Sequence, residues 1–483
     1  MVLPTDVAFA AWMADEELDR QRNIVLARNY YDGLHDVRLT ERQKEFLGYK
    51  TSEGWRFCLN YCNIVVDSVV GRLLLHGVKS SQGNETLDEW ARNMLKLNRL
   101  DAIQMGVHRG AVRDAEHFLV VDWDKEARRP RLSPHPRYTD GQEEVGGSGY
   151  GCKAHYPEND PTLPMLYASK RWTEQRDVNG TNKAVRRMNL YYPDHLEEYA
   201  LDSRAYESSW EPIGPAKPWV DRAGRPLGIP VFHYRNSSGS SELWDAVPIQ
   251  DAINKTALDI LAMADTNAWG FLVAKGFTPT TDGKDPASDG SNLIKVHPGM
   301  WLGPLPADGD IERLAGEDMG PLLAVLDSLI FKLAQVTDTP ISRFQVGLQV
   351  RAEGTLQQQE EPLLAKVREC QVVFGNAWED AALMALRLQN TWGEAVAAPD
   401  DVRFESDWEP GETRDQMADE LAFWTAAEQA GKAGVPLTAF LELQGWDEAK
   451  INKIANSPEH QAKLAMQQAA VANFGGEQQA QNG

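Results

Sequence analysis

Cysteine is scarce in this chain, and no run of eighteen or more apolar residues occurs in it. Four cysteines in 483 residues predict reduced thiols in a cytosol and no disulfide framework: Cys58, Cys62, Cys152 and Cys370. The missing apolar run predicts that there is no transmembrane helix and no membrane partner. The first twenty residues lack a basic segment and meet acidic residues early, which predicts that they are no signal peptide.

The common catalytic motifs are also missing. The sequence contains no Walker-type glycine loop, no G-x-S-x-G, no H-E-x-x-H and no C-x-x-C. We therefore predict no cofactor, no metal site and no catalytic residue. A chain of 53.9 kDa without catalytic groups is expected to have a structural or assembly role.

Negative charge dominates the composition. Asp and Glu number 71 against 49 Lys and Arg, a formal net charge of −22. Proteins that grip DNA through its phosphates carry basic patches, so a tight, wrapped DNA complex is not expected. A surface that DNA passes without sticking remains compatible with this charge. The 42% apolar and 25% charged contents are typical of a globular protein, and the length allows two to four domains.

Two short patterns leave alternatives open. Asp122 and Asp124 end the segment "HFLVVDWD", where a D-x-D pair indicates either a solvated strand exit or a divalent-metal site. Cys58 and Cys62 are four residues apart on a predicted helix. They are interpreted as small buried apolar groups, with a metal site as the alternative.

The isolated basic residues are interpreted in the same way. No nucleophile accompanies His117, His155 or His195, so these histidines are expected to have structural roles. Arg109 and Arg113 are four residues apart on a predicted helix. They indicate a solvated helical face, or alternatively a small basic patch.

The first half of the chain predicts helices followed by a β-rich module. Helical spacing of apolar residues covers 8–32, 57–75, 85–97 and 101–115. Strand patterns cover 117–123, 164–175, 184–200 and 229–236. Glycine and proline separate these strands, which indicates an antiparallel arrangement.

The second half predicts two helices around a small insertion and then a much longer helix. Helices are expected from 249 onwards and over 320–336, with short strands between them in 268–315. The weakly patterned loop 337–354 leads into a helix over 355–392, which Pro362 is expected to kink. A strand and turn over 400–410 precede helices over 414–431, 436–445, 447–457 and 459–474.

This order of elements resembles the portal proteins of tailed bacteriophages, of the long-tailed siphophage type. Three stretches carry the resemblance: "IPVFHYRNSSGSSELWDAVPIQDAINKTALDIL" (229–261), "TPISRFQVGLQVRAEGTLQQQEEPLLAKVRECQVVFGNAWEDAALMAL" (339–386) and "RFESDWEPGETRDQMADELAFWTAAEQAGKAGVPLTAFLELQGWDEAKI" (403–451). The resemblance implies an α+β portal fold with wing, stem, clip and helical crown. The implied parts are wing 1–245, stem helix 246–267, clip 268–318, stem helix 319–336, tunnel loop 337–354, long wing helix and return strand 355–410, crown 411–474 and a disordered tail 475–483.

The resemblance also implies a function. Portal proteins form a ring of about twelve subunits at one capsid vertex, through which DNA is packaged and ejected. The implied partners are further copies of the chain, double-stranded DNA that is not tightly bound, the large terminase subunit, a head-completion adaptor, and the scaffold and major capsid proteins. ATP hydrolysis would belong to the terminase. The implied location is the virion, after assembly in the host cytoplasm.

Candidate site residues follow from this resemblance. Arg343 and Arg351 flank the loop tip and are expected to touch phosphates transiently. Phe344, Val346 and Leu348 are expected to pack against neighbouring loops, and Gly347 gives the loop freedom to move. The remaining loop residues are Gln345 and Gln349. On the stem, the acids proposed to face the lumen and repel DNA are Asp251, Asp259 and Asp327. An ordinary surface loop is the alternative for 337–354.

Two rival functions remain at this stage. A metal-dependent enzyme would use Asp122 and Asp124 and would exist as a monomer or dimer. A virion or scaffold-type protein without a DNA channel would form no closed ring.

Overall fold

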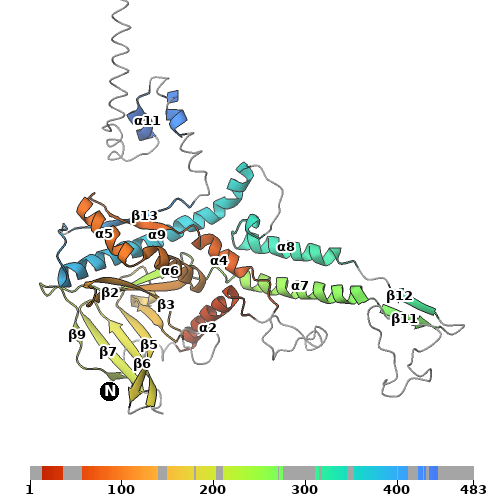
Figure 1. Ribbon diagram of the computed structural model, residues 1–483, viewed down its shortest axis with the longest axis horizontal. Coiled ribbons are helices and arrows are strands. Elements are labelled where there is room, and N and C mark those ends of the chain that lie inside the picture. Colours follow the sequence, from red (N-terminus) through yellow and green to blue (C-terminus); the bar gives the residue numbers. More distant parts are fainter. Residues whose placement is uncertain are drawn as a thin grey trace, which may run out of the picture. The chain divides into compact units, whose positions relative to one another are not determined.

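The computed structural model describes residues 14–35, 57–139, 149–178, 181–202, 210–269, 271–275, 310–314, 318–344, 353–399, 401–411, 423–427, 429–430 and 435–443. The chain divides into two compact units, Met1–Gly411 and Glu412–Gly483. The first unit contains both long helices and antiparallel sheets (Figure 1), which confirms the predicted α+β class. None of the helices in these described ranges is long and apolar enough to cross a bilayer.

Helices from distant parts of the sequence share the main apolar core of the first unit. Among them are α2 (Ala14–Tyr31), α4 (Cys62–Val70), α5 (Glu85–Leu97), α6 (Leu100–Asp114) and α9 (Glu353–Trp392). The Asn84 side chain accepts hydrogen bonds from the amides of Thr86 and Leu87, which fixes the start of α5. The helices predicted over 85–97 and 101–115 are therefore confirmed to within one residue.

The single helix predicted over 57–75 is wrong at both ends. Residues 57–61 are not helical, because the amides of Leu59 and Tyr61 bond to side chains of a distant helix. At the other end, α4 stops before Gly71, and β1 (Leu75–Ser80) pairs antiparallel with β13 (Phe404–Trp408). Cys58 therefore precedes the helix that contains Cys62, and all four cysteines are free thiols.

Two antiparallel sheets make up the β-rich module. One has the order β10–β2–β3, formed by Val231–Arg235, Glu116–Asp124 and Arg129–Pro136. The other runs β4–β5–β6–β7–β8, with β9 also on β7; its bounds are Gly151–His155, Tyr167–Val178, Thr181–Tyr191, His195–Asp202, Glu211–Pro212 and Lys217–Pro218. The segment 184–200, expected as one strand, is two strands, because the chain turns back between β6 and β7. The antiparallel arrangement is confirmed.

Two helices of the first unit lead to a small strand pair. α7 (Ala246–Trp269) and α8 (Gly320–Val336) pack side by side, and β11 (Phe271–Lys275) pairs antiparallel with β12 (Asp310–Leu314) (Figure 1). The expected helices on either side of a small insertion are confirmed. Most of the predicted clip lies outside the described residues.

Two side-chain amides anchor the start of α7. Gln250 and Asn254 are fully buried and stand one helical turn apart. Asn254 Oδ1 accepts from the Leu59 amide at 2.9 Å, and Gln250 Oε1 accepts from the Tyr61 amide at 2.9 Å. The two side chains accept hydrogen bonds from the backbone of the extended segment before α4, as a neighbouring strand would. These bonds fix α7 to the N-terminal helices.

The long helix α9 forms the spine of the core. It runs from Glu353 to Trp392 with Pro362 inside it; the kink at Pro362 stays a prediction. Trp378 is almost completely buried, and its Nε1 donates a 3.0 Å hydrogen bond to Nε2 of the fully buried His108. His108 Nδ1 in turn lies 2.9 Å from the Leu73 carbonyl oxygen. This pairing requires a neutral ring that donates from Nδ1 and accepts at Nε2.

Only a part of the second unit is described. It contains α11 (Leu437–Leu443), in which Leu441 is buried. Phe423 contacts the rings of Trp424 and Phe440 at centroid distances of 5.3 and 5.6 Å. The predicted crown helices over 447–457 and 459–474 and the tail 475–483 lie outside the described residues, as do 414–422 of the helix expected over 414–431.

Candidate functional site at the start of the 337–354 loop

The end of α8 sets the direction in which the loop leaves. The Thr337 hydroxyl donates to the Leu333 carbonyl oxygen at 2.8 Å, and the Thr339 amide donates to the Ala334 carbonyl oxygen at 3.0 Å. Between them, Asp338 has a φ of +53°, in the left-handed region that Asp adopts more readily than most residues. The helix therefore ends in a defined turn that directs the following residues back toward α4.

The first loop residues pack on their own chain. Residues Ile341–Arg343 form a short 3-10 helix, and Arg343 Nε donates to the Ser68 hydroxyl at 3.2 Å. Phe344 is buried in the main core and meets the Tyr61 ring edge-on at 5.9 Å. Our expectation that Phe344 packs against neighbouring loops is wrong, because its side chain belongs to the core at the loop's base.

The predicted tip remains a prediction. Gln345, Val346, Gly347, Leu348, Gln349 and Arg351 lie outside the described residues. The helix that carries the loop's return begins at Glu353, two residues before the predicted start. A salt bridge between Arg72 Nη2 and Glu360 Oε1, at 3.0 Å, holds the first turns of this helix in place.

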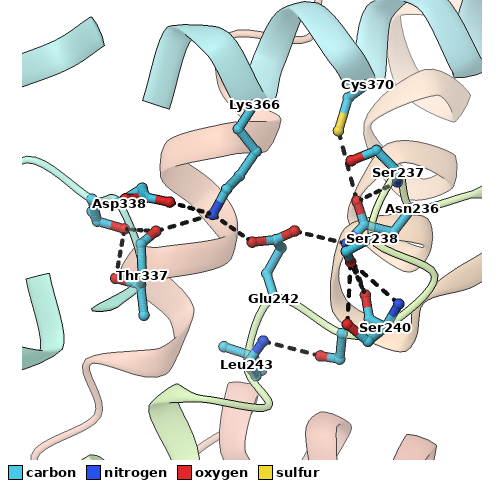
Figure 2. Close-up of polar contacts among 12 residues, drawn as sticks. Asn236, Ser237, Ser238, Ser240, Glu242, Leu243, Thr337, Asp338, Lys366 and Cys370 are labelled. Atoms are coloured by element: carbon cyan, nitrogen blue, oxygen red, sulfur yellow. Dashed lines mark hydrogen bonds and ion pairs between the residues drawn. The ribbon is translucent and has the colours of Figure 1, made fainter. Parts of the chain in front are cut away.

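A single lysine joins three segments at this base. Figure 2 shows Lys366 reaching from α9 between Glu242 on one side and Thr337 and Asp338 on the other. Its Nζ donates to Glu242 Oε2 at 2.7 Å and to the Thr337 carbonyl oxygen at 3.2 Å, and lies 3.7 Å from Asp338 Oδ2. The lysine and Glu242 side chains are only 18% and 9% exposed, so water screens this pair little.

The Glu242 carboxylate is held from its other side as well. Asn236 Nδ2 donates to Glu242 Oε1 at 2.7 Å and to the Ser240 carbonyl oxygen at 2.8 Å (Figure 2). Asn236 Oδ1 accepts from the Ser237 amide and from the Cys370 thiol. The turn that leads into α7 is therefore bonded to α9 and, through Lys366, to the end of α8.

Sequence reasoning missed Lys366, Glu242 and Asn236. Each is an ordinary polar residue in its local pattern, and the contact between Lys366 and Glu242 joins positions 124 residues apart. The sequence offered one signal for Lys366. This charged residue lies close to the apolar positions Leu363 and Val367, on the side of α9 that was predicted to pack against a partner.

A small open pocket lies beside the loop base. Its volume is about 300 Å³, and it is lined by Asn63, Ile64, Asp67, Ser342 and Arg343. Asp67 accepts from the Tyr31 hydroxyl at 3.0 Å and pairs with Arg109 at 3.3 Å. The Asp67 carboxylate in this pocket is therefore already bonded to Tyr31 and Arg109.

Neither arginine of the predicted face on α6 is a free cation. Arg109 pairs with Asp67, and Arg113 Nε donates to Asp114 Oδ1 at 2.7 Å. Burial by itself lowers the pKa of Arg113, but the Asp114 carboxylate more than offsets it and the pKa is raised. The two arginines stabilise the N-terminal helices and do not form a basic patch.

The three stem acids have different surroundings. Asp251 accepts a 2.6 Å hydrogen bond from the Tyr30 hydroxyl of α2. Asp259 pairs with Lys255 at 2.8 Å on the same face of α7, and Asp327 is exposed on α8. Whether these acids face a lumen stays a prediction. The Tyr30 contact engages Asp251 within its own chain.

The predicted histidines have structural surroundings. His117 and His155 are buried, and burial is the main cause that lowers their pKa values, to about 3 and about 2. His155 also stacks on Tyr167 at a centroid distance of 4.3 Å. His195 Nδ1 lies 2.7 Å from Asp194 Oδ1, next to it in the chain. None of them is placed beside a nucleophile by these contacts.

Asp122 and Asp124, the carboxylates that a metal-dependent enzyme would use, accept local hydrogen bonds from backbone amides. Asp124 Oδ1 accepts from the amides of Glu126 and Ala127 at 3.0 and 2.9 Å and so shapes the turn between β2 and β3. Asp122 Oδ1 accepts from the Trp123 amide at 2.7 Å. Within the described ranges, no group of three or more His, Cys, Asp or Glu side chains could hold a metal ion.

The first unit combines helices with antiparallel sheets. Residues 11–463 match the family described as phage portal protein, SPP1 Gp6-like. The chain therefore belongs to this portal family, which confirms the predicted resemblance and places the chain among the structural proteins of the bacteriophage virion.

Individual relatives are distant. The chain is 22% identical to the portal protein of Mycobacterium phage D29 over 412 residues, 81% of this chain and 76% of that protein. It is likewise 22% identical to the portal protein of Mycobacterium phage L5 over 413 residues, with the same shares covered. Two solved structures share 9% and 8% identity with it: the neck of an empty gene transfer agent particle and the virion of the native particle. Their TM-scores are 0.37 and 0.35; the matches cover 77% and 85% of this chain, and 89% and 99% of those chains.

Proposed function

We propose that the chain assembles into a closed ring at one capsid vertex and that DNA passes through the ring during packaging and ejection. Membership of the portal family supports the vertex role. In this proposal the terminase motor and later a head-completion adaptor dock on the ring, and scaffold and major capsid proteins contact its outside. The ring assembles in the host cytoplasm and becomes part of the virion.

The observation that carries the ring is the apolar surface of α8. Its inner side packs against α7 and the core, with Ile330, Leu333 and Ala334 buried. Four large apolar side chains of the same helix are exposed: Leu323, Val325, Phe331 and Val336. Exposed apolar side chains gathered on one helix mark an interaction surface. In a portal protein, the neighbouring copy is the partner that would cover it.

The channel in this proposal is narrowed by the 337–354 loop. Arg343 and Arg351 would touch passing phosphates briefly. Asp259 and Asp327, with the excess of acids in every subunit, would repel the DNA and keep it sliding. The contacts of Phe344 and Lys366 support a loop that starts from a fixed position.

Phe331→Asp tests the ring. Phe331 is 54% exposed in the single chain, so we expect little effect on folding, but in the ring an aspartate would be buried without a partner. We expect the variant to remain unassembled under conditions where the wild-type chain forms a large particle, as measured by light scattering. Leu166→Asp is the matched control, because Leu166 is 51% exposed in the β-rich module. Equal assembly of Phe331→Asp and wild type would contradict the proposed interface.

A further inference from the structure

One charged side chain links the start of the 337–354 loop to the helix that follows the loop. Lys366 belongs to α9, which carries the loop's return, and it bonds to Thr337, where the loop starts. We infer that Lys366 is the positioning residue of this loop: it fixes the loop's start to the helix that carries its end. The inference rests on the proposed function, in which the loop narrows the DNA channel.

The geometry makes the lysine hard to replace. The Thr337 carbonyl oxygen lies at the end of α8, where the backbone oxygens have no further partner within the helix. A cation there is favoured by the helix dipole, and a hydrogen bond from an ammonium group is stronger than one between neutral groups. Glu242 neutralises the same ammonium from the opposite side (Figure 2). Moving the end of α8 away from α9 would break the contact between Lys366 and Thr337.

A second anchor limits how far the loop's base can move. Arg343 bonds to Ser68 and Phe344 packs against Tyr61, both toward α4. Between the two anchors, Asp338 has a positive φ, a conformation that costs backbone energy and persists only where its surroundings hold it. Lys366 lies 3.7 Å from this carboxylate as well. The consequence is that the loop tip starts from a base that moves together with α9.

The test uses the double variant Lys366→Met with Glu242→Gln in the full-length chain. Methionine keeps most of the length of the side chain, and glutamine avoids leaving a buried carboxylate without its cation. We expect the Thr337 and Thr339 amides to exchange hydrogen about tenfold faster than in wild type. The amides of α6, in the core, should exchange as before. Lys332→Met is the matched control, because Lys332 is an exposed lysine on α8 whose Nζ donates to Gln335 Oε1 at 3.3 Å.

Averaged particle images give the second readout. Rings of the double variant should keep the wild-type outline and lose density at the channel's narrowest part. An unchanged hydrogen exchange rate at the Thr337 amide would overturn the positioning role. An equal increase in the exchange rates of the α6 amides would also overturn it, because Lys366 would then stabilise the whole unit and not the loop's start. A wild-type chain that forms no ring would instead contradict the proposed function, and the exchange rates would still decide the role of Lys366.

Discussion

Trp378→Ala is expected to lower the free energy of unfolding of the first unit by about 3–5 kcal/mol. Trp378 is 1% exposed and lies where α9 crosses the core. Its ring meets Tyr234 edge-on at a centroid distance of 5.3 Å, and its Nε1 donates to His108. Alanine would leave a large cavity and also a buried imidazole nitrogen without its donor.

Chemical denaturation followed by circular dichroism, at one fixed protein concentration, measures this loss. Trp244→Ala is the control, since Trp244 is 49% exposed on the turn before α7. We expect it to change the free energy of unfolding by no more than about 0.5 kcal/mol. Similar losses for the two variants would show that the α9 contacts are not the centre of the fold.

Acidification is expected to destabilise the same core through His108. Burial lowers the pKa of His108 to about 4, partly opposed by its hydrogen bond to the Leu73 carbonyl oxygen, whereas an unfolded histidine titrates near about 6.5. The unfolded chain therefore binds a proton that the folded chain excludes. The stability from the neutral ring is fully present above about pH 6.5 and is lost progressively as the pH falls toward about 4.

Between pH 7.5 and pH 5 this one group should account for about 2 kcal/mol of lost stability. Other buried or partly buried histidines act in the same direction, because burial also lowers the pKa values of His117, His135 and His155. His108→Gln should reduce the difference in unfolding free energy between the two pH values by about 2 kcal/mol. The same substitution at the exposed His76 should leave the difference unchanged. An unaltered pH dependence in His108→Gln would contradict the burial of a neutral ring.

Much of the fold could be predicted because its signals are local. The helices around the insertion, the long helix containing Pro362, and the antiparallel strands all follow from apolar spacing within short windows. β1 could not be predicted in this way. Its partner β13 is more than three hundred residues away, and without that partner Leu75 looks like the end of the apolar helix predicted over 57–75.

The candidate site was less predictable for the same reason. Phe344 looks like a loop residue in sequence, but Tyr61, from a distant segment, provides the surface that buries it. Lys366 and Glu242 acquire their importance only when α9 passes the turn before α7. No periodic pattern encodes such contacts, because each depends on how separate elements pack.

The mass of the purified particle, with negative-stain images of the same sample, tests the ring most directly. The account predicts a closed ring with a central hole and, for about twelve copies of the 53.9 kDa chain, a mass of roughly 650 kDa. A compact monomer or dimer that shows no hole at any protein concentration, and binds a divalent metal through Asp122 and Asp124, would contradict it.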